Sequence, residues 1–209
     1  MTDQRYPSMS SSPITLTTAQ LLKNKTAFNH AQLEEVLLPY LQRCATPEVY
    51  AGILRSFYGF FAPLEVLIQQ QVNSSVIPDM HQRRKAELIL DDLGFVGGNE
   101  PLLVCTTLPS ITTMFEALGA MYVLEGSTLG GRGITKMLLK TNPSWQEEMR
   151  FFSGYGESTG QKWTLFVATI NTYVAEEEVT GMVAAADDCF LKFRCWLEHC
   201  IKTGAVKSL

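Results

Sequence analysis

Residues 17–41, TTAQLLKNKTAFNHAQLEEVLLPYL, carry the pattern that decides the fold class. Their apolar side chains recur mostly at steps of three and four residues, which is the period of an amphipathic α-helix. The positions are Leu21, Leu22, Phe28, Leu33, Val36, Leu37, Tyr40 and Leu41. Thr17 or Thr18 is suited to cap the start of this helix, because a threonine hydroxyl accepts a free backbone N–H there. We therefore predict a long first helix.

The next segment predicts a second helix. Residues 46–48, Thr-Pro-Glu, place a capping residue before a proline at the first helical position. Apolar residues at helical spacing then continue to about Leu67. Pro63 lies inside this pattern and is expected to bend the helix, because proline removes one backbone donor and crowds the preceding turn.

The rest of the chain predicts further helices and shows no strand alternation. A shorter helix is expected over residues 80–93, and a long one over about 112–140. Residues 144–158 are irregular and aromatic, and residues 159–203 predict two helices that meet near 173–178. We therefore predict an all-α fold in the form of a helical bundle.

Composition supports one compact domain. Of the 209 residues, 46% are hydrophobic and 18% are charged, which is enough apolar material for a full core. Residues 1–16 are polar and lack the apolar region of a signal peptide, so we expect a disordered lead-in before a single domain over residues 17–209. The apolar stretch 57–68 is interrupted by Pro63 and Glu65 and is shorter than the ~20 residues that span a bilayer. We expect a soluble, cytoplasmic protein with no membrane partner.

Charge and cysteine usage exclude two further classes of protein. The formal net charge of −4 argues against a nucleic-acid partner, because nucleic-acid binders usually carry a basic surface. The five cysteines are odd in number and scattered, and no two form a C-x-x-C pair. Neither a disulfide framework nor a zinc site is therefore favoured, and we expect buried or free thiols.

Glycines interrupt the long helix predicted over residues 112–140. They are Gly119, Gly126, Gly130, Gly131 and Gly133. Each interior glycine costs about 1 kcal/mol relative to alanine, so several together need an explanation. Missing side chains would let the backbone bend and lie directly against a flat ligand. Tight packing against another helix, or a loop between two helices, is the alternative.

His30 is the one of the three histidines that lies on a strongly amphipathic helix, four residues before Glu34 and on the same face. A neutral imidazole can ligate iron through one nitrogen while the other donates to a carboxylate, often through water. An interior or surface histidine without a ligand is the alternative. His81 and His199 lie near polar residues and are expected at the surface.

Two stretches resemble signature motifs of the haem oxygenase family. Residues 22–34, LKNKTAFNHAQLE, are similar to the proximal helix of that family, with Thr26, His30 and Glu34 at the matching places. Residues 117–131, ALGAMYVLEGSTLGG, are similar to the distal helix of bacterial members, especially those associated with bacteriophytochromes. Both motifs occur in the right order and separation, so the chain resembles the biliverdin-producing bacterial enzymes.

The resemblance implies a haem that is sandwiched between a proximal helix and a kinked, glycine-rich distal helix. His30 would be the metal ligand, and Glu34 would support it. The implied catalytic positions on the oxygen-binding face are Gly126, Ser127, Gly130 and Gly131. Further cofactor-binding positions implied by matching relatives are Lys23, Lys136, Tyr122 and Phe190, and Arg132 is a candidate from spacing alone. The cations would face the haem propionates.

The implied reaction is the oxidative cleavage of haem with O2 to biliverdin, carbon monoxide and ferrous iron, so haem is both substrate and cofactor. Electrons would come from an external ferredoxin- or flavoprotein-type donor, and a bacteriophytochrome is a candidate recipient of biliverdin. A non-catalytic haem-binding or storage protein of the same fold is one alternative. A thiamin-degrading or cofactor-synthesising enzyme of similar helical architecture is another, although no convincing nucleophile for it is found.

The sequence departs from the animal enzymes of this family at two places. Ser127 stands where they carry an aspartate, a departure that active bacterial relatives share. Thr164 and Ala168 stand where they place basic residues on a late helix. These differences leave open the orientation of haem, and hence which meso carbon is attacked.

Overall fold

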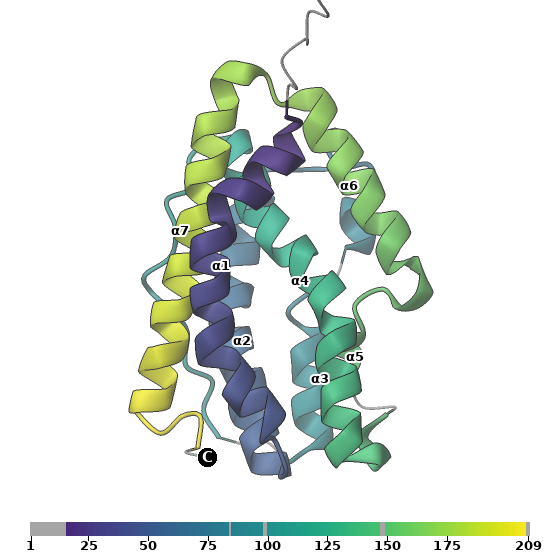
Figure 1. Ribbon diagram of the computed structural model, residues 1–209, viewed down its shortest axis with the longest axis vertical. Coiled ribbons are helices and arrows are strands. Elements are labelled where there is room, and N and C mark those ends of the chain that lie inside the picture. The colour runs from purple at the N-terminus through teal and green to yellow at the C-terminus, as the bar shows by residue number, and fades with distance from the viewer. Residues whose placement is uncertain (1–15, 84, 98–99, 147–148, 208–209) are drawn as a thin grey trace, which may run out of the picture.

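The computed structural model describes residues 16–83, 85–97, 100–146 and 149–207, and every regular element in these ranges is a helix (Figure 1). In chain order the elements are α1 (Thr18–Gln42), α2 (Pro47–Gln71), η1 (Met80–Gln82), α3 (Leu88–Phe95), α4 (Met114–Thr141), η2 (Pro143–Trp145), α5 (Arg150–Ser153), η3 (Gly156–Ser158), α6 (Thr159–Tyr173) and α7 (Glu176–Lys202). The predicted all-α fold is confirmed. The expected lead-in over residues 1–16 lies almost wholly outside the described residues.

α1 begins where the sequence predicts. The Thr17 side chain accepts the backbone N–H of Gln20, and the Gln20 side chain accepts that of Thr17, which together form a capping box. The buried residues of the helix then follow one stripe at steps of mostly three and four. They are Leu22, Thr26, Leu33, Leu37 and Leu41, after Thr18 in the first turn. This stripe turns one side of α1 toward the core.

α2 runs without interruption through Pro63. Proline cannot donate to the carbonyl of Gly59, and that carbonyl instead accepts the backbone N–H of Cys105 at 2.8 Å. The approach is close because Gly59 has no side chain, and an added Cβ would collide with the carbonyl oxygen of Leu103. The extended segment before α4 therefore supplies the bond that the proline leaves unmade.

Residues 80–93 do not form the single helix that the sequence predicts, and this expectation is wrong. They divide into the single turn η1 and the start of α3, and Arg83 between them has an extended backbone. The Arg83 side chain turns inward to Glu125, and the Glu65 carboxylate accepts the backbone N–H of Ala86 at 2.9 Å. Contacts with distant segments thus replace helical hydrogen bonds, and local periodicity carries no signal of such contacts.

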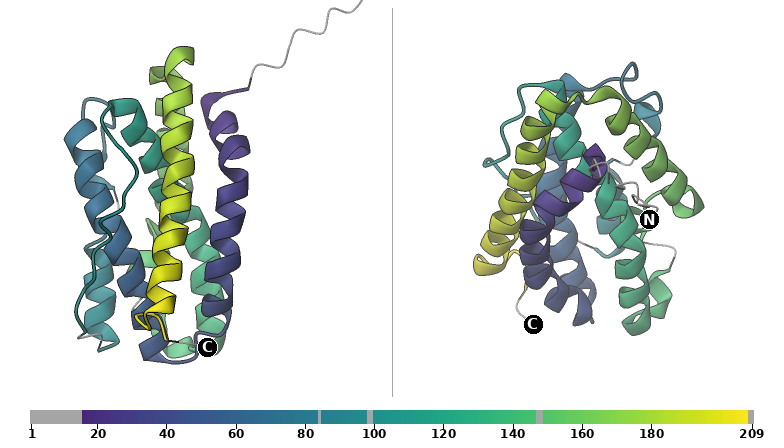
Figure 2. Two further views of the ribbon diagram at one scale, coloured as in Figure 1. Left: turned by 90° about the vertical axis from the view of Figure 1, so that its left-hand side faces the viewer. Right: turned by 45° about the horizontal axis from the view of Figure 1, so that its top comes forward.

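α7 packs extensively on both α1 and α4 (Figures 1 and 2). These three helices run in the same direction, from the top to the bottom of Figure 1. Aromatic rings fill the core where α2, α5 and α7 meet. They are Phe57, Phe60, Phe61, Phe151, Phe152 and Phe193. Burial of such a side chain contributes roughly 1.5–3 kcal/mol, so two rings anchor the single turn of α5.

α2 is also long and apolar enough to cross a membrane, judged by length and composition alone. Its most apolar section is 67% buried inside the fold. The apolar character of α2 therefore fits a core helix, because burial against other helices already covers most of it.

Candidate functional site

His30 belongs to the core-facing stripe of α1, yet its side chain is 50% exposed. It lies four residues after Thr26 and three before Leu33, and both of these are buried. Helical geometry points the three side chains in similar directions. The core therefore leaves the imidazole uncovered at this one position of the stripe.

The contacts of His30 leave one ring nitrogen accessible. Its ring meets the edge of Phe190 on α7, with centroids 5.1 Å apart and an interplanar angle of 86°. Its Nδ1 lies 3.7 Å from Oε2 of Glu34, which is beyond a direct hydrogen bond and within reach of a water-mediated one. No described protein group hydrogen-bonds to Nε2. The arrangement suits an imidazole that binds a metal through Nε2.

The glycines of α4 fall into two groups with different surroundings. At Gly119 and Gly131 an added Cβ would collide with a carbonyl oxygen, of Met182 on α7 and of Phe152 on α5 respectively. These two glycines permit close helix packing, which was the alternative left open by the sequence. At Gly130 and Gly133 an added Cβ would meet no described atom within 4 Å beyond the adjacent residues and the nearby backbone of α4 itself.

The second group forms one face of α4, which we call the glycine face. Gly126, Leu129, Gly130 and Gly133 follow at helical spacing, and the leucine side chain is exposed. A Cβ on Gly126 would meet only the Trp163 ring of α6, at 3.8 Å. The glycine face thus exposes main-chain atoms, as a flat ligand lying against the helix requires.

His30 and the glycine face lie at a similar height in the bundle. Gly119 packs against Met182 of α7, and Phe190, which His30 contacts, lies about two turns further along α7. Gly126 lies about two turns beyond Gly119 on α4. Since α4 and α7 run in the same direction (Figure 1), helical rise puts His30 and Gly126 at a similar height along the bundle.

Two predicted pocket residues have contacts that fit this arrangement. Phe190 is buried against His30. Tyr122 is half-buried, and burial raises the pKa of its phenol. Its ring packs against Trp163 with centroids 5.5 Å apart, next to Gly126. Trp163 thus borders the candidate site, although no sequence pattern singled it out.

Ser127 and Gly131, the other two predicted catalytic positions, do not lie on the glycine face. The Ser127 hydroxyl donates to the carbonyl of Leu124 at 2.7 Å, within its own helix. Gly131 is turned toward the backbone of Phe152, as described above. Packing explains Gly131, whereas Ser127 lies beside the glycine face.

The predicted cations do not converge on one place. Arg132 and Lys136 line a groove of about 580 Å³ near the end of α4, whose lining does not include His30, and Arg132 donates to the carbonyl of Gly156 at 2.9 Å. Lys23 is exposed about two turns before His30 on α1. With His30 level with Gly126, helical rise places Lys23 and Lys136 roughly 25 Å apart along the bundle. The two lysines therefore do not belong to one cluster of positive charge.

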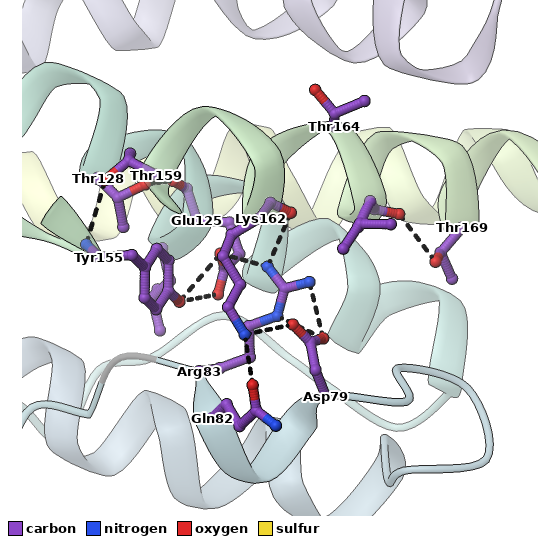
Figure 3. Close-up of polar contacts among 12 residues, drawn as sticks. Asp79, Gln82, Arg83, Glu125, Thr128, Tyr155, Thr159, Lys162, Thr164 and Thr169 are labelled. Carbon is purple, nitrogen blue, oxygen red and sulfur yellow. Dashed lines mark hydrogen bonds and ion pairs between the residues drawn. The ribbon is translucent and has the colours of Figure 1, made fainter. Parts of the chain in front are cut away.

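A buried ion network surrounds Glu125 of α4 (Figure 3). Glu125 precedes Gly126, and its carboxylate accepts from Arg83 at 2.8 Å and from the Tyr155 hydroxyl at 2.9 Å. The Arg83 and Glu125 side chains are 3% and 6% exposed. Arg83 also pairs with Asp79 at 2.9 Å, and Lys162 of α6 lies 2.7 Å from the same carboxylate. Burial opposes ionisation of Asp79, but Lys162 and Arg83 hold its pKa below the usual value.

One feature of the sequence could have predicted part of this network. Glu125 is the only charged residue between 117 and 131, within a segment of the predicted helix that is otherwise mostly apolar residues and glycine. A buried carboxylate needs a partner, because an unpaired buried charge is strongly destabilising. The partner itself could not be inferred, since Arg83 lies 42 residues away in the chain and in a segment predicted to be helical.

Comparison with known proteins identifies bacterial relatives, although no family model matches the chain. It is 28% identical to a haem oxygenase of Xanthomonas campestris pv. campestris over 140 residues, which cover 67% of this chain and 79% of that protein. It is 25% identical to haem oxygenase PigA of Pseudomonas aeruginosa over 182 residues, which cover 87% and 91% of the two chains.

Solved structures of two bacterial haem oxygenases have the same fold. The NO- and CO-bound enzyme of Neisseria meningitidis matches with a TM-score of 0.75 at 21% identity, over 89% of this chain and 92% of that one. The enzyme of Leptospira interrogans matches with a TM-score of 0.71 at 15% identity, over 88% of this chain and all of that one. By sequence this chain is similar to bacterial haem oxygenases, and it shares their fold.

Proposed function

We propose that the chain is a haem oxygenase that cleaves haem to biliverdin, carbon monoxide and ferrous iron, with O2 and electrons from an external donor. The observation that carries this proposal is the uncovered His30 ring in the core-facing stripe of α1, level with the glycine face of α4. The relatives named as haem oxygenases support the same activity.

The residues between α1 and α4 fit a flat iron porphyrin. His30 offers Nε2 as a metal ligand, and Glu34 is placed to orient the ring through Nδ1. Gly126 and Gly130 leave space that a side chain would otherwise fill, so the α4 backbone can approach the opposite face of the macrocycle. Phe190 supports the imidazole from α7.

The iron of the bound haem supplies the oxygen chemistry, and the protein determines access and orientation. The smooth glycine face limits the space above the ring, and Tyr122 with Trp163 closes one side of it. Ser127 offers a hydroxyl beside this face, already bonded to a main-chain carbonyl. Proton supply therefore relies on several water and main-chain groups, with Ser127 as a minor contributor.

Lys23, Arg132 and Lys136 are the proposed cationic partners of the propionates. Because Lys23 lies far from the other two, the orientation of the bound haem would determine which of these side chains pairs with a propionate. A ferredoxin- or flavoprotein-type protein is the proposed electron donor, and a bacteriophytochrome is a candidate recipient of the product. We expect the reaction to take place in the cytoplasm, where such donors are found.

Turnover with purified protein tests the proposal. Haem and a reductant should lead to loss of the Soret band and to biliverdin, identified by chromatography, whereas a storage protein would keep the band. His30→Ala should abolish this turnover, and His199→Ala serves as the matched control because that histidine is exposed near the C-terminal end of α7. Haem binding by the wild-type protein without any biliverdin would refute the enzymatic assignment.

A further inference from the structure

We propose that Arg83 and Glu125 are positioning residues whose buried ion pair fixes Trp163 against Gly126 and thereby helps to select the edge of the haem that is attacked. This inference rests on the proposed function for its consequence, but the positioning itself belongs to the protein without haem.

Arg83 connects three segments that are distant in the chain. Its guanidinium bonds to Asp79 beside η1, to Glu125 of α4 and to the backbone carbonyl of Lys162 in α6, the last at 3.1 Å (Figure 3). A planar guanidinium holds its partners in fixed directions, because its donors form a rigid fork. The position of α6 relative to α4 is thus defined by directional bonds.

Lys162 is held at both its backbone and its side chain. Its carbonyl accepts from Arg83, and its ammonium group bonds to Asp79 at 2.7 Å and to Gln82 at 3.0 Å. The following residue is Trp163, whose ring borders Gly126 and packs on Tyr122. A bond to the carbonyl of residue 162 acts on the peptide group that it shares with Trp163, so the network fixes the backbone from which the indole projects.

The network matters because α6 has little else to hold this end in place. Three residues of the helix are buried, namely Thr159, Phe166 and Ile170. α6 packs less extensively on α4 than α7 does, and it lies at the outer side of the bundle in Figure 1. Apolar contacts alone leave a helix free to slide or rotate slightly, whereas charge-assisted hydrogen bonds specify one position.

Trp163 and Tyr122 together form a wall beside the first glycine of the glycine face. A haem held by His30 could still rotate about the bond between His30 and the iron. The side chains around the ring, including this wall, would therefore determine which edge of the haem faces away from Trp163 and Tyr122. A displaced indole would admit a second orientation. The ion pair should therefore influence the ratio of biliverdin isomers more than the capacity to bind haem.

Two variants separate positioning from folding. Glu125→Gln keeps the side-chain shape and removes the charge, and Arg83→Met with Glu125→Leu removes both charges at once. Replacement of a buried pair by apolar residues often preserves stability, because no charge is left unpaired. Glu198→Gln is the control, since it breaks an ion pair with Arg194 that lies within α7 and is partly exposed.

The first readout uses haem-free protein labelled with 5-fluorotryptophan. The chain has three tryptophans, and the fluorine resonance that disappears in Trp163→Phe identifies the one of interest. We expect that resonance to shift and broaden in Glu125→Gln and in the double variant, and to stay unchanged in Glu198→Gln. The resonances of Trp145 and Trp196 should stay in place and report an intact fold.

The second readout is the isomer ratio of the biliverdin product. Loss of one orienting hydrogen bond should raise the minor isomer relative to the major one by roughly five-fold. An unchanged Trp163 resonance together with an unchanged isomer ratio in the double variant would overturn the inference. If the wild-type protein forms no biliverdin, the proposed function fails, and the fluorine resonance alone decides whether the pair positions Trp163.

Discussion

Two adjacent glycines of α4 should respond to alanine in opposite ways: one replacement should stabilise the protein and the other should destabilise it. Gly130 and Gly131 lie next to each other in α4, yet an added Cβ finds open space at Gly130 and the backbone of Phe152 at Gly131. At Gly131 that Cβ would lie 3.2 Å from the Phe152 carbonyl carbon and still closer to its oxygen. The obstacle is main chain of α5, which the buried ring of Phe152 anchors in the core.

The expected sizes follow from the two environments. Gly130→Ala should stabilise the haem-free protein by about 0.5–1 kcal/mol, because alanine is the better helix former. Gly131→Ala gains the same amount but incurs roughly 1–3 kcal/mol of overpacking, so a net loss of up to about 2.5 kcal/mol is expected. For a protein of this length, 1 kcal/mol corresponds to about 2–4 °C in Tm.

Thermal unfolding of both haem-free variants, monitored by circular dichroism, measures these effects on stability. A haem titration measures the affinity of each variant for haem. Gly130→Ala should melt higher than wild type but bind haem more weakly, whereas Gly131→Ala should melt lower. If Gly131→Ala is at least as stable as wild type, or Gly130→Ala strengthens haem binding, the division of the α4 glycines into packing and ligand-facing positions is wrong.

Three further predictions concern single residues. His30→Ala should remove the protein ligand of the iron and alter the ferric haem spectrum; an unchanged spectrum would exclude His30 as ligand. Ser127→Ala should slow ring opening less than roughly tenfold, about 1.4 kcal/mol in the barrier, in single-turnover measurements, because its hydroxyl already bonds to its own helix; a complete arrest would contradict this. Burial raises the pKa of Asp92 to about 6, although two backbone N–H groups of α5 stabilise its charged form. The folded state then binds this proton more tightly than the unfolded chain, so the free energy of unfolding should fall by on the order of 2–3 kcal/mol as the pH rises from about 4 to about 6. Denaturant unfolding across this range should show a smaller decline for Asp92→Asn, and equal declines would refute the assignment.

The elements that local signals define were predictable. The caps at Thr17, Thr46 and Thr113 all lie where the sequence places helix starts, because a hydroxyl that accepts a backbone N–H acts over three residues. The one helix predicted wrongly, over residues 80–93, contains Arg83. Its long-range contacts, which no local period records, decide the backbone there.

The sequence by itself determined the all-α class and the long helices, since these depend on residue type and spacing along one chain. Only the tertiary structure decided which glycines face open space and which face another backbone, because neighbouring residues of a helix point in different directions. It also decided the partner of Glu125, since a buried charge specifies that a partner exists but folding alone brings Arg83 to it.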